Sequence, residues 1–287
     1  MAATQRSLSG KRALITGASR GIGLAIARRF AAEGAAVVLC ASRWGAHGEL
    51  KGTLQEAVDN IQAQGADAAG VACDLSDAEA RADLVARAQQ CFGPLDIIVN
   101  NAAVSKMRLP SEVTSAERNW MYDVNVNVPM ELAQQAIPGM RTRGGGWILN
   151  ISSSSALQPV VPYRDSQLAA HVICAYGATK AALDRYTQGL GHELAPDHIY
   201  VNTLAPENIV LTSGADYVRD IARRNPDMVE PVETMAEAAL VLCTGSHVGR
   251  VTYSRRLLHS LGLPVMSLDG ERVLGDAFIP ADVESTV

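Results

Sequence analysis

A tyrosine and a lysine one helical turn apart are the residues of this chain whose types and spacing best suit acid–base chemistry. Tyr176 and Lys180 lie in the segment Tyr-Gly-Ala-Thr-Lys. Residues four apart share one face of a helix, so the ammonium group can lie near the phenol. A phenol alone titrates near ~10, and a neighbouring cation favours the phenolate and lowers that pKa. The pair therefore predicts a tyrosine that takes or gives a proton near neutral pH.

A glycine-rich turn near the start of the chain predicts a site for a nucleotide that carries phosphate groups. Residues 16–23 read Thr-Gly-Ala-Ser-Arg-Gly-Ile-Gly, between a predicted strand and a predicted helix. Glycine allows a tight turn, and the backbone N–H groups at the start of the helix can approach a pyrophosphate. The spacing differs from the more familiar Gly-x-Gly-x-x-Gly, so the strand–turn–helix context is what supports this interpretation over a plain glycine turn.

The end of the second predicted strand discriminates between two nicotinamide dinucleotides. An NAD site usually has an acidic residue about twenty positions after the glycine turn, which binds the ribose 2′-hydroxyl. Here Ser42 and Arg43 follow the strand instead, and Arg20 lies in the glycine turn. Guanidinium groups bind phosphate through paired hydrogen bonds, so we expect NADP(H) rather than NAD(H). The alternative is that both arginines are surface residues without a ligand.

Polar residues follow two further predicted strands. Asp74 is placed either to accept a hydrogen bond from the adenine amino group or to cap the following turn. Residues 100–103 read Asn-Asn-Ala-Ala and are expected to line the adenosine side with backbone and amide groups.

Apolar runs and their spacing predict the elements that position these residues. The expected strands are Arg12–Thr16, Ala36–Ala41, 67–72, 95–99, Gly146–Ile151, 200–204 and 249–253. The expected helices are 22–33, 50–64, 77–91, 119–140 and 176–194. Near-continuous apolar strands separated by helices indicate a parallel sheet covered on both faces. We therefore expect a single α/β domain of three layers, a doubly wound Rossmann-type fold with its crevice at the carboxyl ends of the strands.

Composition and charge exclude several other classes of protein. The 287 residues are 48% hydrophobic and 19% charged, with a net charge of −5, which argues against a nucleic-acid binder. The polar N-terminus and the lack of a long apolar run argue against a secretory signal and a membrane span. Five cysteines without a Cys-x-x-Cys pair suit reduced thiols in a cytoplasmic protein. His192 and His198 have the wrong spacing for a zinc helix, so no metal site is expected.

Together these motifs resemble the short-chain dehydrogenase/reductase family. Residues 16–23, Asp74, 100–103, Asn125, Ser153, Tyr176 with Lys180, and 202–206 occur in that family's order, and the resemblance extends to about residue 212. It implies one doubly wound domain and a nicotinamide dinucleotide cofactor. By resemblance, Tyr176 is the general acid/base, and Lys180 binds the nicotinamide ribose and lowers the tyrosine pKa. Ser153 hydrogen-bonds the substrate oxygen, and Asn125 holds a water that links Lys180 to solvent.

The resemblance completes the set of expected site residues. The expected catalytic residues are Asn125, Ser153, Tyr176 and Lys180. The expected cofactor contacts are Gly17, Ser19, Arg20, Gly21, Ile22, Gly23, Ser42, Arg43, Asp74, Leu75, Asn101, Ala102, Ala103, Tyr176, Lys180, Pro206 and Ile209. Ser153 is one of four consecutive serines, Asn127 is a rival to Asn125, and a merely structural asparagine is the alternative role.

The chain departs from the family pattern at three places. Ala103 replaces a glycine, which crowds the cofactor side, and Glu207 replaces the glycine that usually follows Pro206. Ser153 and Tyr176 are 23 positions apart, more than the family's usual spacing. We interpret the extra segment, residues 157–174, as a loop over the substrate mouth, and a surface excursion remote from the site is the alternative.

The expected function is an NADP(H)-dependent oxidoreductase that interconverts a secondary alcohol and a ketone or aldehyde. Apolar residues in the expected pocket walls, such as Val104, Met107 and Leu157, favour an apolar substrate. Three arginines, namely Arg108, Arg164 and Arg219, also suit an acidic or acyl-carrier substrate. Residues 1–256 are expected to form the catalytic domain. Residues 257–287 are expected to form an extension that packs on it or on a neighbouring subunit of a homo-oligomer. A nucleotide-sensing regulator and a lyase or epimerase with tightly held cofactor are the alternative functions.

Overall fold

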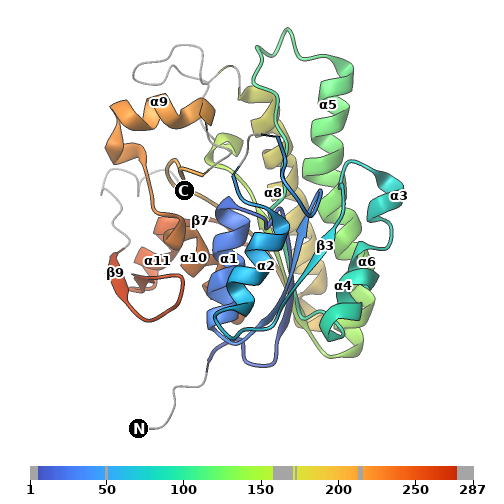
Figure 1. Cartoon of the computed structure of the whole chain (residues 1–287). Coiled ribbons are helices and arrows are strands. Elements are labelled where there is room, and N and C mark those ends of the chain that lie inside the picture. Colours follow the sequence, from blue (N-terminus) through green and yellow to red (C-terminus); the bar gives the residue numbers. More distant parts are fainter. Residues whose placement is uncertain (1–5, 49–50, 158–170, 172, 213–215, 277–287) are drawn as a thin grey trace.

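Seven parallel strands form one sheet at the centre of the computed structural model, which describes residues 6–48, 51–157, 171, 173–212 and 216–276 (Figure 1). Their order across the sheet is β3-β2-β1-β4-β5-β6-β7. The strands are β1 (Arg12–Thr16), β2 (Ala36–Ala41), β3 (Ala68–Ala72), β4 (Ile97–Asn100), β5 (Gly146–Ile151), β6 (Ile199–Ala205) and β7 (Val251–Tyr253). Every neighbouring pair is parallel.

The first strand lies inside the sheet and not at its edge. It pairs with β2 on one side and with β4 on the other, so the chain winds outward in both directions. The carboxyl ends of all seven strands meet at one edge, and the reversal of order between β1 and β4 opens a crevice there. The predicted doubly wound, Rossmann-type α/β domain is confirmed.

Helices cover both faces of the sheet, which explains why the strands are apolar throughout. Successive strand residues point to opposite faces, so Ala13 and Ile15 belong to one core and Leu14 to the other. The first core is closed by α1 (Gly21–Ala32), α2 (Leu54–Gln62), α10 (Val232–Thr244) and α11 (Ser254–Ser260). The second is closed by α4 (Leu84–Phe92), α6 (Val128–Thr142) and α8 (Cys174–Leu194).

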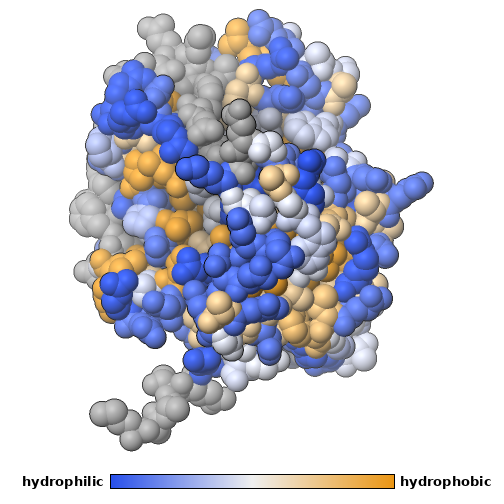
Figure 2. All heavy atoms as spheres, in the orientation of Figure 1, coloured by the Kyte–Doolittle hydropathy of each residue, from blue (hydrophilic) through white to orange (hydrophobic). Residues whose placement is uncertain are grey.

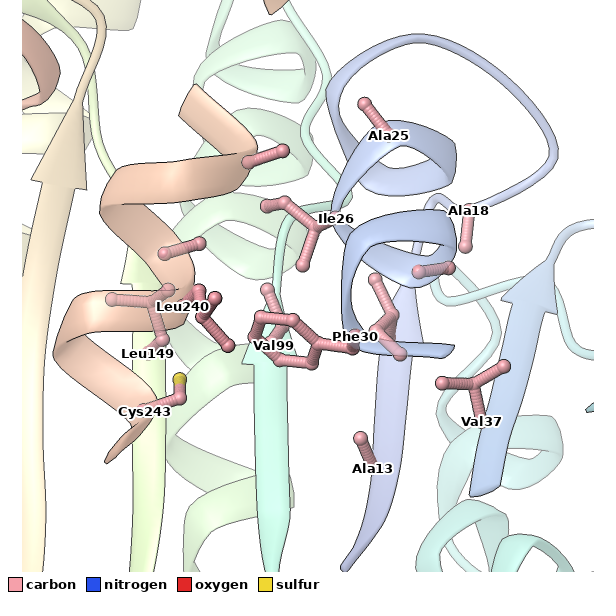
Figure 3. Close-up of a cluster of buried hydrophobic side chains, with 14 of the residues drawn as sticks. Ala13, Ala18, Ala25, Ile26, Phe30, Val37, Val99, Leu149, Leu240 and Cys243 are labelled. Carbon is pink, nitrogen blue, oxygen red and sulfur yellow. The ribbon is translucent and has the colours of Figure 1, made fainter. Parts of the chain in front are cut away.

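The larger core is centred on α1 and α10. Figure 3 shows the Phe30 ring directed from α1 toward Leu240 of α10 and toward the strand residues Val99 and Leu149. Phe30 is fully buried, which contributes about 2–3 kcal/mol relative to an exposed side chain. This packing holds α1, and with it the glycine turn at its start, against the sheet.

The predicted helix 119–140 is three segments in the structure. They are α5 (Ser115–Tyr122), the π-helical turn η1 (Asp123–Asn127) and α6. Pro129 has no N–H, so it cannot make the α-helical hydrogen bond to the carbonyl of Asn125, and the wider turn lies at that point. The prediction of one uninterrupted helix was wrong there for this reason.

Two other predicted helices have different bounds. The helix predicted at 50–64 begins only at Leu54, where Thr53 and Glu56 form a capping box. The helix predicted at 77–91 is divided into α3 (Ala78–Arg81), which Asp77 caps, and α4. The described residues between β2 and α2, 42–48 and 51–53, therefore form a longer connection than the sequence predicts.

The C-terminal region packs on the same core. Leu257 and Leu258 of α11 are fully buried, so the boundary predicted after residue 256 falls inside a helix. Beyond it, β8 (Pro264–Met266) and β9 (Val273–Asp276) form an antiparallel pair that exposes Val273 and Leu274 (orange near β9 in Figure 2). None of the described helices has the length and apolar character needed to cross a bilayer.

Candidate active site

A cavity of 450 Å³ lies at the carboxyl ends of the central strands. Its lining includes nine of the expected cofactor contacts, namely Gly17, Ser19, Arg20, Ser42, Arg43, Asp74, Leu75, Ala102 and Ala103. Gly21, Ile22, Gly23 and Asn101 lie in the glycine turn or directly beneath it. The remaining four expected contacts lie neither in the lining nor at the glycine turn: Tyr176, Lys180, Pro206 and Ile209.

The glycine turn needs its glycines because other chain segments lie against it. Gly17 and Gly21 have positive φ angles of 63° and 58°. A Cβ on Gly17 would lie 2.9 Å from the Cα of Ala102, and one on Gly23 would lie 2.5 Å from the amide of Asn101. That amide donates to the carbonyls of Thr16 (2.9 Å) and Gly17 (3.1 Å), so Asn101 braces the turn from below. The turn therefore presents its N–H groups at the start of α1.

Two guanidinium groups lie in the lining of the cavity. Arg20 donates through Nη2 to the carbonyl of Gly52 at 3.0 Å, while its buried Nε has no partner in the described chain. Arg43 and Ser42 also line the cavity, and the Ser42 hydroxyl lies 3.1 Å from Nδ1 of His47. Guanidinium donors beside a glycine turn fit a ligand with several phosphate groups, so these residues suit a dinucleotide with a 2′-phosphate.

Asp74 fulfils one of its two alternative roles. Its Oδ1 accepts from the backbone N–H (3.0 Å) and the hydroxyl (2.7 Å) of Ser76, and these bonds hold the pKa of the carboxyl below its usual value. Arg43 and His47 lower that pKa further. Asp74 thus caps the turn after β3 while its side chain lines the cavity.

The sequence did not predict several residues of the lining, among them two with large polar or aromatic side chains. His47 lies in the connection between β2 and α2, and Trp120 lies on α5 near Val104 and Val124. The capping box at Thr53 and Glu56 was the available signal for His47, because it moves the start of α2 and lengthens the connection before it. No sequence pattern singled out Trp120.

Tyr176 and Lys180 lie on one face of α8, as their spacing predicts. Nζ of Lys180 lies 5.7 Å from the centre of the Tyr176 ring and donates to the carbonyl of Ile151 at 2.7 Å. Burial lowers the pKa of Lys180 to about 8, although the negative charge of Asp184 acts in the opposite direction. The lysine therefore ties α8 to the end of β5 through its ammonium group.

The described contacts do not show the lysine lowering the pKa of Tyr176, so that effect stays a prediction. Burial raises the pKa of Tyr176 to about 12, and only the hydrogen bond from Ser153 lowers it. The ammonium group is directed to the Ile151 carbonyl, and burial outweighs its charge at this distance.

Ser153 is the serine that acts on Tyr176. Its hydroxyl hydrogen-bonds the tyrosine and also accepts from the hydroxyl of Ser155 at 2.9 Å. Ser153 caps η2 (Ser154–Ala156), a short 3-10 turn that packs against α8. A Cβ on Gly177 would lie 2.5 Å from the carbonyl oxygen of Ser155, so this glycine permits the close approach.

Asn125 is a buried structural brace beneath the site. Its side chain exchanges two hydrogen bonds with the backbone of Val104, both 2.8 Å, and donates to the hydroxyl of Thr179 at 3.0 Å. Thr179 in turn donates to the carbonyl of Tyr176 at 2.7 Å. Its rival Asn127 is exposed and bonds only Asp123. The described contacts support the structural role and do not test the predicted water.

The loop after β6 crosses above the glycine turn. Thr212 lies 3.2 Å from the position that a Cβ on Gly21 would occupy. Ile209 pairs by its backbone with the segment at Val229, so its N–H and carbonyl are engaged. Glu207 forms an ion pair of 3.1 Å with Arg256 of α11, which ties this loop to the C-terminal region. The glutamate that replaces the family's glycine therefore has a packing role.

Buried polar residues link the strands below the site, and the sequence reasoning missed them. Asn100 donates to Asn150 on the next strand, and Asn150 donates to Thr187 of α8, both at 2.8 Å. The available signal was an asparagine at the end of each of two neighbouring apolar strands, where Asn100 pairs with Asn150.

Most of the segment predicted as a substrate loop, 157–174, lies outside the described residues. Among the residues that are described, no group of three His, Cys, Asp or Glu could hold a metal ion.

A family model described as short chain dehydrogenase matches residues 11–221. The chain belongs to the short-chain dehydrogenase family. It is 36% identical over 201 residues to "Dehydrogenase/reductase SDR family member 4" of Homo sapiens, an alignment that covers 69% of this chain and 66% of the relative. It is 37% identical over 202 residues to gluconate 5-dehydrogenase of Gluconobacter oxydans, covering 70% and 72% of the two chains.

Solved structures of this family agree with the fold. L-sorbose reductase from Gluconobacter frateurii, complexed with NADPH and L-sorbose, has a TM-score of 0.73 at 30% identity, covering 87% of this chain and 97% of the other. A 7α-hydroxysteroid dehydrogenase complexed with NADH has a TM-score of 0.75 at 29% identity, covering 88% and 96%. The predicted class, an NAD(P)-dependent oxidoreductase acting on CH–OH groups, is confirmed by this membership.

Proposed function

We propose that this short-chain dehydrogenase uses NADP(H) to interconvert a secondary alcohol and a ketone or aldehyde of apolar character. The observation that carries the proposal is the meeting of Tyr176, Ser153 and Lys180 at the carboxyl end of β5. A hydroxyl pair and a buried ammonium at the carboxyl end of β5, on the same edge of the sheet as the cavity, suit carbonyl chemistry.

Each of the three residues has a separate task in this proposal. The hydroxyls of Ser153 and Tyr176 hydrogen-bond the substrate oxygen, where negative charge grows during reduction. Tyr176 then gives its proton to that oxygen, and it takes the proton back when an alcohol is oxidised. Lys180 keeps a positive charge near the phenol and binds the ribose. The bound dinucleotide supplies or accepts the hydride.

The preference for NADP(H) rests on Arg20, Ser42 and Arg43. Related structures contain NADPH or NADH, so family membership alone leaves the preference open. Two guanidinium groups and a hydroxyl at the end of β2 favour a 2′-phosphate. Steady-state kinetics with both cofactors test this point, and a higher kcat/KM with NAD than with NADP would contradict it.

An apolar substrate is favoured over an acidic one by the described part of the pocket wall. Val104, Val124 and Trp120 lie together in the lining. Arg108, one of the two described candidates for binding an acidic substrate, forms an ion pair of 2.9 Å with Glu117, and the other, Arg219, donates to the carbonyl of Thr212. The charge of Arg108 is therefore already balanced.

The deciding experiment is a screen of ketones and secondary alcohols followed at the NADPH absorbance, with Tyr176→Phe as the control. We expect turnover of apolar ketones by the wild type and a loss of at least about a hundredfold in the variant. Turnover that survives in Tyr176→Phe would remove the acid–base assignment. We further propose a cytoplasmic homo-oligomer, which a concentration-independent monomer mass in solution scattering would refute.

A further inference from the structure

A buried carboxylate lies one helical turn beyond the lysine of the site. Asp184 and Lys180 both lie on the face of α8 that packs against the sheet, and they are 9% and 2% exposed. Residues four apart on a helix are neighbours, so the carboxylate lies behind the ammonium group, on the side away from Tyr176. The acid–base roles proposed above do not use Asp184.

The carboxylate has few neighbours that could compensate a buried charge. Its Oδ1 has no hydrogen-bond partner in the described chain. The hydroxyls of Ser152 and Thr203 lie close to Asp184 and favour its charged form. Two neutral hydroxyls supply no positive charge, so the charge of the carboxylate needs a cation nearby.

In the described part of the chain, Lys180 is the cation that acts on Asp184. Burial raises the pKa of Asp184, and the charge of Lys180 lowers it. In return, Asp184 raises the pKa of Lys180 against the effect of burial. Two other titratable groups on the elements around the pair are Tyr176 on α8 and Tyr253 on β7, whose pKa Asp184 raises. Arg256 lies over the Tyr253 ring at 4.9 Å and forms its ion pair with Glu207.

We infer that Asp184 is a positioning residue for the acid–base pair: its negative charge keeps Lys180 protonated at the pH at which the enzyme works. The inference rests on the proposed function. A buried lysine without a counter-charge releases its proton more easily, and a neutral amine would neither stabilise developing phenolate character on Tyr176 nor donate a full set of hydrogen bonds.

The first test is the pH profile of the Asp184→Asn variant. Without the carboxylate, Lys180 loses its proton at a lower pH, so the alkaline limb of kcat/KM for ketone reduction moves to lower pH. For a displacement of one pH unit, we expect kcat/KM at pH 9 to fall about tenfold relative to the wild type, with a change of less than about twofold at pH 6. An unchanged alkaline limb would overturn the inference.

Two further variants separate charge from packing. Asp184→Glu keeps the negative charge, so we expect the alkaline limb of its kcat/KM profile to lie at the same pH as in the wild type. We expect this even if the variant is less stable. Thr203→Val removes a hydroxyl and keeps the carboxylate. The alkaline limb of its kcat/KM profile should therefore stay within about 0.3 pH units of the wild type. A purely structural role predicts the opposite pattern, in which all three variants lose stability and none moves the limb.

A titration that needs no substrate distinguishes this inference from the proposed function. The chain contains only Lys11, Lys51, Lys106 and Lys180, so ¹³C-labelled lysine gives a simple NMR spectrum in which Lys180→Met identifies the buried signal. We expect that signal to titrate at lower pH in Asp184→Asn than in the wild type. Identical titrations would refute the charge pair. A displaced titration in a protein without any turnover would refute the proposed function and leave the charge pair intact.

Discussion

At the scale of single residues, the buried face of α8 moves the pKa values of its functional groups in opposite directions. The pKa of Tyr176 is raised to about 12 and that of Lys180 is lowered to about 8, both because burial favours the uncharged form. Near neutral pH the chain therefore holds a protonated phenol beside a charged ammonium. A protonated phenol is a proton donor, so the resting site is prepared for the reduction of a carbonyl.

The cofactor preference can be tested at one arginine. We expect Arg43→Ala to lower kcat/KM for NADPH by about 10–100-fold, because charge-assisted hydrogen bonds to a phosphate contribute about 1.5–3 kcal/mol. The value for NADH, which lacks that phosphate, should change by less than about twofold. Arg141→Ala is the matched control, since Arg141 lies in the last turn of α6 and pairs with Asp197. Equal losses with both cofactors would contradict a 2′-phosphate contact.

The free energy of unfolding distinguishes the structural roles of Asn125 and Asn127. Asn125→Ala removes three buried hydrogen bonds and leaves the backbone of Val104 unpaired, so we expect the free energy of unfolding to fall by about 3 kcal/mol. Asn127→Ala removes one long bond at the surface and should stay within about 0.5 kcal/mol of the wild type. Urea denaturation measures both. A small loss in Asn125→Ala would show that its contacts do not brace the site.

At the scale of elements, the contact between η2 and α8 sets the distance between the serine and the tyrosine. Ser153 caps η2, Tyr176 lies in the first turn of α8, and Gly177 is the point where the two elements touch. The Tyr-Gly segment therefore has a packing requirement in addition to the chemistry of its tyrosine.

Two glycines of α8 provide a matched pair of substitutions. In Gly177→Ala the new methyl would lie 2.5 Å from the Ser155 carbonyl, so η2 must move and carry Ser153 away from Tyr176. We expect kcat to fall about 10–100-fold while the KM for NADPH changes less than about twofold. Gly189 has open space around it, and Gly189→Ala should keep full activity and raise stability by about 0.5–1 kcal/mol. An active Gly177→Ala enzyme would show that the contact is not needed.

At the scale of the whole molecule, the sheet and the cofactor cavity could be predicted from sequence, and the supporting contacts could not. Strands buried on both faces are apolar runs, and the glycine turn and Tyr176 with Lys180 have local signatures. The π-helical turn at Asn125 does not appear in the apolar pattern, because the missing N–H of Pro129 changes the helix without changing that pattern, and Pro129 itself was the available signal. The burial of Asp184 and the direction of the Tyr176 pKa depend on residues distant in sequence, so only the packed structure shows them.

A cluster of buried charges joins the loop after β6 to the C-terminal region. Glu230 accepts from the Ser254 hydroxyl at 2.6 Å and from the Asn208 backbone at 3.2 Å, and its side chain is fully buried. Burial raises its pKa to about 7, and the nearby charge of Glu207 raises it further, whereas Ser254 and Arg255 lower it. This carboxylate therefore couples the attachment of α11 to the protonation state of the molecule.

The raised pKa of Glu230 predicts how the stability of the whole protein changes with pH. Because the pKa of Glu230 is higher in the folded chain than its ordinary 4.5, its contribution to stability is full below pH 4.5 and is lost as the pH rises through about 7. We expect Glu230→Gln to remove this loss and to gain up to about 3 kcal/mol relative to the wild type between pH 5 and pH 8. Urea denaturation at both values measures the difference, with Glu271→Gln on the exposed β8–β9 turn as the control. If the wild type and Glu230→Gln show the same change in stability between these pH values, Glu230 does not titrate in this range, and the loop is held by its hydrogen bonds alone.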